Sequence, residues 1–160
     1  MIMSTNIIDY LDKDSICLEV KRKNKRNVIS HILDYLISKK KITQANKKEI
    51  NKLLIQREEM GSTAIGGCIA LPHARVNSVK DIVICLAIAP EGVDFDSLDQ
   101  EKVNIIALLL SNQKEAGLHL KMLAFLARML RDKYFVQQLK IAKTKEDVLA
   151  LVNKQQQAVR

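Results

Sequence analysis

Two long apolar runs, DIVICLAI over 81–88 and VNIIALLL over 103–110, most constrain what this chain can fold into. A strand with one face in water alternates apolar and polar residues. An unbroken run of branched and aliphatic residues therefore indicates a strand that is covered on both faces. Two such runs predict the centre of a sheet that is packed between layers of helices.

The first half of the chain shows strand and helix periodicity around these runs. Apolar and polar residues alternate over 14–20, and a short apolar segment occupies 68–71, so we expect a strand at each place. Helical spacing predicts a helix over 26–38. A second helix is expected to begin at an N-cap, Thr43, and to end near Gly61.

The chain after Ser111 is predicted to be helical. The first of three expected helices carries one apolar stripe, which consists of Leu120, Leu123, Ala124, Ala127 and Leu130. The second covers about 134–142, and the third begins at Thr144 and frays in the polar tail QQQAVR. This order of strands and helices predicts an α/β fold, a three-layer sandwich with a mixed sheet.

The composition is that of a single globular domain over residues 1–160. Of these residues 48% are apolar and 28% charged, which excludes wholesale disorder and fibrous repeats. No apolar run reaches the length of a membrane span, and the N-terminus lacks the features of a signal peptide. We therefore expect no membrane insertion and a cytoplasmic location. Three cysteines without CxxC spacing and three scattered histidines predict neither a disulfide framework nor a metal site, and no cofactor is expected.

The formal net charge of +8 raises the question of an acidic partner. The chain has 26 Lys and Arg against 18 Asp and Glu, and the excess is dispersed. No Trp and only six Tyr and Phe are present, so platforms on which nucleic acid bases could stack are scarce. A solvated basic surface is the favoured interpretation, and nucleic acid is not the expected partner.

The three histidines occupy different settings. His31 lies within the predicted helix over 26–38 and is interpreted as a helix residue without chemistry. His73 follows Pro72 at the end of an apolar strand, where ligands tend to bind in α/β sheets. His119 lies near a helix N-terminus on an apolar stripe. It is either a satisfied core residue or a donor that faces an anion.

Arg57 continues the apolar register of Leu53 and Leu54, where a guanidinium is costly unless it is paired or reaches solvent. One interpretation is a structural ion pair with Glu58, Glu59 or another carboxylate. The other is an arginine at the rim of a pocket that holds an oxyanion, a task that suits its permanent charge and forked donors.

The segment 61–67, GSTAIGG, joins these candidates. Its small residues permit close approach of the backbone, and the hydroxyls of Ser62 and Thr63 add donors. No GxxxxGK[ST] motif occurs, so nucleotide hydrolysis has no motif here. A thiol enzyme built on Cys68 and His73 is disfavoured, because residues five apart on one strand point to opposite faces.

Four stretches of the sequence together resemble the enzyme IIA domains of the fructose/mannitol type, from the bacterial phosphoenolpyruvate-dependent phosphotransferase system. They are REEMGSTAIGGCIALPHAR over 57–75, VDFDSLDQEKVNIIALLL over 93–110, HLKMLAFLARML over 119–130 and IIDYLDKDSICLEV over 7–20. The resemblance covers about residues 6–153. It implies a mixed sheet of five strands between helices.

The resemblance also implies roles for individual residues. His73, after the proline, would accept a phosphoryl group on Nε2. His119 would orient and stabilise the phosphorylated ring, and Arg57 would neutralise the phosphate. We expect Ser62 and Thr63 to support the phosphate site. Because Arg57 and His119 are both misfits on apolar stripes, we also predict that they approach His73 in one shallow site at the sheet edge.

The family contains two branches with different partners. Sugar-transport members receive phosphate from an HPr-type phosphocarrier and pass it to an enzyme IIB. Nitrogen-type members are mainly regulatory and act on target proteins. A chain of 160 residues that contains neither a IIB nor a membrane domain favours the nitrogen-type branch. The alternatives are a sugar-transport IIA component and a non-transferring regulator that uses its basic surface on acidic proteins or nucleic acid.

Docking of partner proteins over His73 predicts an apolar rim around a shallow site. The candidates for this rim are Ile65, Ile69, Leu71 and Phe95. The basic excess lies mostly before Arg57, and we expect it to steer partners or solubilise the chain.

Overall fold

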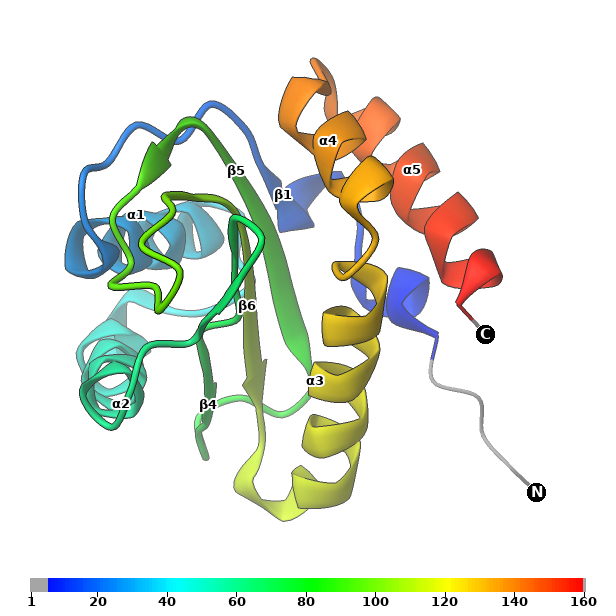
Figure 1. The fold of residues 1–160 in the computed structure, drawn as a ribbon. Coiled ribbons are helices and arrows are strands. Elements are labelled where there is room, and N and C mark those ends of the chain that lie inside the picture. Colours follow the sequence, from blue (N-terminus) through cyan, green and yellow to red (C-terminus); the bar gives the residue numbers. More distant parts are fainter. Residues whose placement is uncertain (1–5, 160) are drawn as a thin grey trace.

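A computed structural model describes residues 6–159, and Figure 1 shows that they form three layers. A sheet lies in the middle, and helices cover both of its faces. One face carries α1 (Lys25–Ser38) and α2 (Lys47–Glu59), and the other carries α3 (Ala116–Met129), α4 (Lys133–Ile141) and α5 (Lys145–Ala158). The predicted three-layer α/β sandwich is confirmed.

The sheet is mixed and, within the described residues, has six strands in the order β1-β5-β6-β3-β2, with β4 also paired to β6. β5 and β6 are antiparallel, as are β2 and β3, whereas β1 runs parallel to β5, and β3 and β4 both run parallel to β6. The strands are β1 (Ile16–Cys17), β2 (Ala64–Gly66), β3 (Ile69–Ala70), β4 (His73–Arg75), β5 (Val83–Val93) and β6 (Val103–Ser111).

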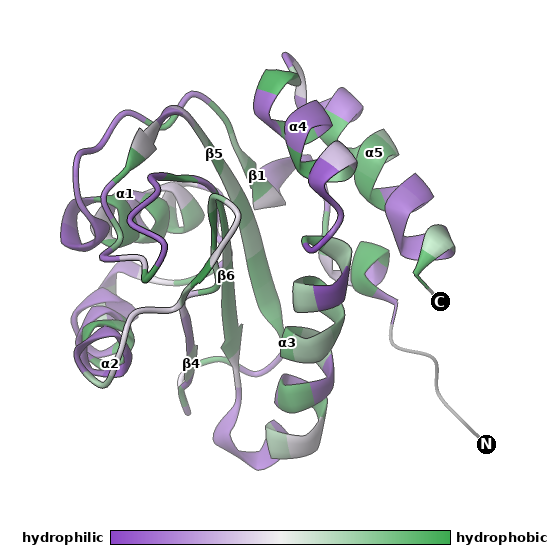
Figure 2. Ribbon diagram, in the orientation of Figure 1, coloured by the Kyte–Doolittle hydropathy of each residue, from purple (hydrophilic) through white to green (hydrophobic). Residues whose placement is uncertain are grey.

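The two apolar runs form the centre of the sheet, as predicted. Every residue of β6 is buried, and so are the residues of β5 from Ile84 to Ala89. Figure 2 shows these two strands as largely hydrophobic ribbons between helices that carry both hydrophobic and hydrophilic residues. Apolar clusters pack on both faces of the sheet, so the strands contribute side chains to two cores.

The sheet has a sixth strand because Pro72 divides the segment that runs beside β6 into two short strands, β3 and β4. Both of these strands pair with β6. β3 pairs with β6 at Ile105 and Ile106, and β4 pairs with the same strand from Leu109 onward. Between them, the carbonyl of Pro72 accepts a hydrogen bond from the Leu109 amide at 3.0 Å. The prediction that the ladder stops at Pro72 is therefore wrong, and the chain remains extended beyond it.

The predicted strand over 14–20 is shorter than expected. A 3₁₀ turn occupies Lys13–Ser15, and only Ile16–Cys17 pair with β5 as a named strand. Glu19 then adopts φ 54°, which breaks the extended run, although the amide of Val20 still bonds to the carbonyl of Ile88.

The first two helices match the sequence closely, with one correction. α1 begins after Asn24, whose side chain caps the amide of Asn27 at 3.0 Å. Thr43 does not cap α2. It makes no side-chain cap bond and precedes a 3₁₀ turn over Gln44–Asn46, so α2 begins at Lys47. α2 ends before Gly61, which has φ 141°.

α3 has a different buried face from the one predicted. Leu120 is 67% exposed and Ala124 is exposed as well. The buried residues are His119, Met122, Phe125, Leu126 and Met129. The helix is rotated by about one residue because this face buries larger apolar side chains than a stripe with two alanines does.

The C-terminal segment is ordered as part of α5. Thr144 caps this helix through the Asp147 amide, as predicted. The expectation that the tail frays is wrong for residues up to 159, because Gln155 and Gln156 are buried. Gln156 accepts a hydrogen bond from the Ile8 amide, and Gln155 donates to the carbonyl of Met129. Amide side chains can therefore anchor a polar tail onto the fold.

None of the helices in residues 6–159 combines the length and the apolar character that crossing a bilayer requires.

Candidate functional site

His73 is the first residue of β4 and pairs in register with Leu109 of β6. It therefore lies in an edge strand, whereas the sequence placed it after the end of one. Its ring nitrogen Nδ1 lies 2.7 Å from the carbonyl oxygen of Leu71. A carbonyl can only accept a hydrogen bond, so Nδ1 carries the proton of the neutral ring. Nε2 is then left with its lone pair, which is the form of histidine that can act as a nucleophile.

The surroundings of His73 keep the ring neutral. Burial lowers the pKa of His73 below its usual value of 6.5, and the nearby charge of Arg57 acts in the same direction. The hydrogen bond to Leu71 and the carboxylate of Glu58 oppose these effects and do not overcome them. The basic form of the imidazole consequently dominates at neutral pH.

His119 lies across from His73 on the first turn of α3. The two ring centroids are 5.5 Å apart and the ring planes are tilted by 58°. The His119 side chain is buried, and its Nδ1 lies 2.5 Å from the hydroxyl oxygen of Ser111. Burial, repulsion from the protonated form of His73 and the charge of Arg75 lower the pKa of His119 to about 4. His119 is therefore also neutral at pH 7.

Arg57 approaches the same place from the last turn of α2. Its guanidinium Nη1 donates to the carbonyl of Gly61 at 2.7 Å, and the side chain is half-buried. Among the ion pairs of residues 6–159, none involves Arg57, and Glu59 pairs with Arg26 instead. The interpretation of Arg57 as part of a structural ion pair is thus not supported, and the positive charge remains open to a ligand.

The three side chains line one open hollow of about 680 Å³ at the end of the sheet. Its wall comes from α2, β4, the β6–α3 connection and α3. It is lined by Leu53, Arg57, His73, Ala74, Arg75, Gln113, Ala116, His119, Leu120 and Leu123. The predicted approach of Arg57 and His119 to His73 is confirmed. Among the described residues, two arginines and no carboxylate line the hollow, which favours an anion.

Ser62 and Thr63 lie outside this hollow, against the prediction that they support a phosphate site. The Ser62 hydroxyl donates to the carbonyl of Phe95 and accepts from the Ala64 amide. The Thr63 hydroxyl donates to the buried carboxylate of Glu58 at 2.5 Å, and the Thr63 amide donates to the same carboxylate at 3.0 Å. These hydroxyls brace the loop after α2 and have no donor free for an anion.

The structure adds residues to the site that the sequence did not single out. Arg75 is two residues after His73 on β4 and lines the same hollow, a relation that strand periodicity could have revealed. Ser111 ends β6 in register with Arg75 and reaches His119. The local sequence around Ser111 does not indicate this role, because the hydrogen bond joins β6 to α3.

The apolar rim differs from the predicted one. Ile69, Leu71 and Phe95 are buried, and the exposed Ile65 lines a separate hollow beside β2 and the end of α3. The apolar residues at the His73 hollow are Leu53, Ala74, Ala116, Leu120 and Leu123. The exposed Leu120 therefore presents an apolar surface beside the histidines, as docking of a protein partner requires.

Cys68 and His73 do not form a pair. Cys68 has φ 71° in the turn between β2 and β3 and lines the separate hollow that contains Ile65. Within residues 6–159, His, Cys, Asp and Glu side chains do not gather in any group of three or more that could hold a metal ion.

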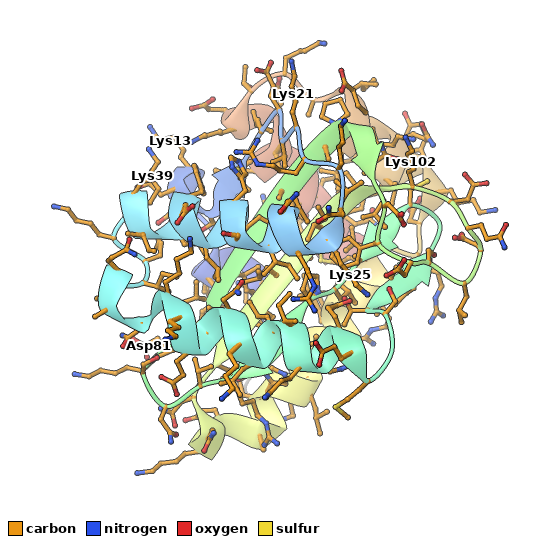
Figure 3. All side chains as sticks on the ribbon, turned by 90° about the vertical axis from the view of Figure 1, so that its left-hand side faces the viewer. Lys13, Lys21, Lys25, Lys39, Asp81 and Lys102 are labelled. Carbon is orange, nitrogen blue, oxygen red and sulfur yellow. The ribbon has the colours of Figure 1, made fainter. Side chains whose placement is uncertain are left out.

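Basic residues surround the outer face of α1 and α2. Figure 3 looks onto this face and shows Lys13, Lys21 and Lys39 at its periphery and Lys25 nearer its centre. Carboxylates lie among them, and the Lys25–Asp96 pair, for example, has a separation of 3.0 Å. The face is basic but of mixed charge.

Comparisons with known proteins agree with this geometry. Residues 9–155 match the family described as phosphoenolpyruvate-dependent sugar phosphotransferase system, EIIA 2. A nitrogen regulatory protein of Bradyrhizobium diazoefficiens is 27% identical over 146 residues, which cover 91% of this chain and 94% of that protein. The crystal structure of nitrogen regulatory protein IIA-Ntr from Neisseria meningitidis is similar with a TM-score of 0.82 and 27% identity. The match covers 91% of this chain and 98% of the Neisseria meningitidis chain.

A sugar-specific relative is similar to the same extent. The PTS system fructose-specific EIIABC component of Bacillus subtilis is 28% identical over 147 residues, which cover 92% of this chain. The match spans only 23% of that longer protein. Its substrate and its other parts therefore say nothing by themselves about this chain.

Proposed function

The chain belongs to the EIIA 2 family of the phosphoenolpyruvate-dependent sugar phosphotransferase system, and on this premise we propose that His73 accepts and passes on a phosphoryl group. The observation that carries the proposal is the hydrogen bond from His73 Nδ1 to the carbonyl of Leu71 at 2.7 Å. It leaves Nε2 unprotonated in a hollow that two arginines and a second histidine line.

The transfer can be written without any movement of a proton. The Nε2 lone pair attacks the phosphorus of a phosphohistidine on the donor, and a new nitrogen–phosphorus bond forms. The donor's own nitrogen–phosphorus bond breaks, and its electron pair returns to the donor ring. The proton of His73 stays on Nδ1, hydrogen-bonded to the Leu71 carbonyl, before and after the transfer. Release to an acceptor is the reverse, with the neutral ring as leaving group.

The remaining groups of the site supply charge stabilisation. Phosphoryl transfer depends on positioning and on neutralising the charge of the phosphoryl oxygens. Arg57 and Arg75 lie on the wall of the hollow as permanent cations. His119, buried and neutral, contributes a directional group next to the nucleophile.

The partners follow from the same chemistry. The donor is an HPr-type phosphocarrier, and the acceptor is either an enzyme IIB or a regulatory target. We favour a regulatory role of the nitrogen type. Two similar proteins, from Bradyrhizobium diazoefficiens and Neisseria meningitidis, carry that description and are matched over 94% and 98% of their length. The second candidate, sugar transport, is supported by the fructose-specific relative from Bacillus subtilis.

The test is phosphorylation with phosphoenolpyruvate, enzyme I and HPr, followed by intact mass measurement. We expect one acid-labile addition of about 80 Da, the mass of one phosphoryl group. The label should be absent from His73→Gln and present in His31→Gln, a control that removes a histidine of α1. A label that survives in His73→Gln would assign the phosphoryl group to another residue.

The two roles are separated by adding a purified enzyme IIB to the labelled protein. Rapid loss of the label to the IIB protein identifies a transport component. A label that persists in the presence of IIB proteins supports the regulatory role, in which the phosphorylation state itself is the signal.

A further inference from the structure

A buried hydroxyl holds the second histidine of the site. Ser111 is 0% exposed at the end of β6, and its Oγ lies 2.5 Å from Nδ1 of His119. The backbone carbonyl of Ser111 is already engaged by the Val76 amide at 2.7 Å, which fixes the residue in place. The side-chain contact is therefore made from a rigid position.

The direction of this hydrogen bond can be deduced from the available partners. Within residues 6–159, His119 Nδ1 is the sole hydrogen-bond partner of the Ser111 hydroxyl. If Nδ1 were the donor, the hydroxyl proton would be buried without an acceptor, which is costly. The arrangement in which every group is satisfied has Ser111 as donor and Nδ1 as acceptor.

The protonation of the other ring nitrogen follows. His119 is neutral at pH 7, because burial, with repulsion from the protonated form of His73 and from Arg75, lowers its pKa to about 4. A neutral imidazole carries one proton. With Nδ1 as acceptor, that proton is on Nε2, the nitrogen left to face the hollow that His119 lines.

We propose that Ser111 is a positioning residue that holds His119 as the Nε2–H tautomer, so that this ring donates a hydrogen bond to the phosphoryl group on His73. The proposal rests on the proposed function of His73. It assigns opposite tautomers to the two rings. His73 has its proton on Nδ1, held by the Leu71 carbonyl, and His119 has its proton on Nε2, set by Ser111.

The tautomer matters because the phosphoryl group is anionic. An Nε2–H group attracts its oxygens, and a hydrogen bond to a charged acceptor is stronger than one between neutral groups. The other tautomer would present a lone pair to the same oxygens and repel them. A neutral donor also adds no net charge, so His119 holds the phosphoryl group without adding a further cation to Arg57 and Arg75.

The strand register explains how the fold builds this pair. His73 and Arg75 are opposite Leu109 and Ser111 in the parallel ladder of β4 and β6. The last residue of β6 is therefore beside the site, under the first turn of α3 that carries His119. A shift of one residue would place Leu110 there, which has no hydroxyl.

The first test needs no phosphoryl donor. The full chain is labelled with ¹⁵N, and two-bond proton–nitrogen correlations of the His119 ring are recorded at pH 7. We expect Nε2 to show the shift of a protonated nitrogen and Nδ1 that of an unprotonated one. The opposite pattern, or an even mixture of tautomers, would overturn the proposal even if His73 is phosphorylated normally.

The second test uses variants whose folding is checked by circular dichroism and thermal unfolding. Ser111→Ala should shift His119 toward a mixture of tautomers and slow phosphoryl transfer at His73 about tenfold, the value of one hydrogen bond. Ser111→Thr keeps the hydroxyl and should restore both properties. The matched control is Ser15→Ala, which removes a buried hydroxyl whose partner is Asp12 and should change neither.

A double-variant comparison separates positioning from packing. In a His119→Gln background, Ser111→Ala should cause no further loss of transfer rate, because Ser111 acts through His119. A loss of the same size in both backgrounds would show that Ser111 acts by another route and would reject the proposal. Absence of phosphorylation in the wild-type chain would reject the proposed function, while the tautomer measurement would still judge Ser111.

Discussion

Two buried polar clusters lie near the end of α2 and the start of α3, and they are built from similar groups. In one, Glu58 accepts hydrogen bonds from the amide and the hydroxyl of Thr63. In the other, the hydroxyl of Ser111 contacts Nδ1 of His119. Each pairs a titratable side chain with a hydroxyl, and both are shielded from water.

The clusters differ in what they leave unsatisfied. Both carboxylate oxygens of Glu58 are occupied by Thr63, so this cluster is closed. His119 uses one ring nitrogen for Ser111 and keeps the other for the hollow that contains His73. A polar cluster can act on a ligand only through a group that its neighbours do not already satisfy. The closed cluster is structural, and the open one is the candidate site.

The largest expected effect concerns Arg57, which belongs to the open cluster although it is adjacent to Glu58. Arg57→Gln should slow phosphoryl transfer to His73 by about 100-fold to 1000-fold, the usual cost of one charge-stabilising donor. The half-buried side chain contributes little to folding, so thermal unfolding should be nearly unchanged. Arg26→Gln, which removes an exposed arginine of α1, is the control and should retain the wild-type rate.

For the closed cluster of Glu58 and Thr63 we expect the opposite result, a loss of stability with little change in the transfer rate. Glu58→Ala removes an acceptor that is 3% exposed and strands two donors of Thr63. We expect the free energy of unfolding to fall by about 2–3 kcal/mol, measured by urea denaturation. The transfer rate of the folded protein should stay within about threefold of wild type. A large loss of rate without loss of stability would place Glu58 in the site and show that the two clusters do not differ in function.

The open cluster of Ser111 and His119 should also make the stability of the protein depend on pH. The pKa of His119 is lowered from 6.5 to about 4, so below pH 6.5 the folded chain binds fewer protons than the unfolded chain. Stability therefore falls as the pH drops, by about 1–2 kcal/mol between pH 6.5 and pH 5 from this group. His119→Gln should lose this part of the slope in urea denaturation. An unchanged slope would show that His119 is not held neutral.

The smallest effect is expected from the basic face of α1. Changing the three lysines at 39–41 to Gln should slow transfer from HPr no more than about threefold, because exposed charges are screened over about 8 Å at physiological ionic strength. The difference from wild type should vanish at high salt. The control changes Lys140, Lys143 and Lys154 to Gln for the same loss of charge elsewhere. Complete loss of phosphorylation in the folded 39–41 variant would extend the site onto this face.

Much of the fold was predictable because it depends on local pattern and burial. The two continuous apolar runs predicted the central strands, and the N-cap Thr144 predicted the start of α5. The predictions failed where the choice lay between similar alternatives. The buried face of α3 depends on which side chains fill the space against the sheet. The length of β1 depends on one residue, Glu19, that takes up a positive φ.

The sequence by itself identified three of the groups that we propose carry the chemistry. The proline before His73, the arginine on an apolar helical stripe and the histidine near a helix start are chemical misfits that can be recognised without coordinates. The family motif joins them. Only the tertiary structure decided how each group is used. Hydrogen bonds between elements distant in the chain direct the hydroxyls of Ser62 and Thr63 away from the site.

The same is true of Ser111 and Arg75. Their place in the site is set by the parallel register of β4 and β6, which aligns the ends of two strands that the sequence separates by a long interval. The tautomer of each histidine depends on a single neighbouring oxygen, from Leu71 or Ser111. A hydrogen bond depends on distance and direction at the scale of an ångström. Composition and periodicity carry no information at that scale, so only the packed structure could decide it.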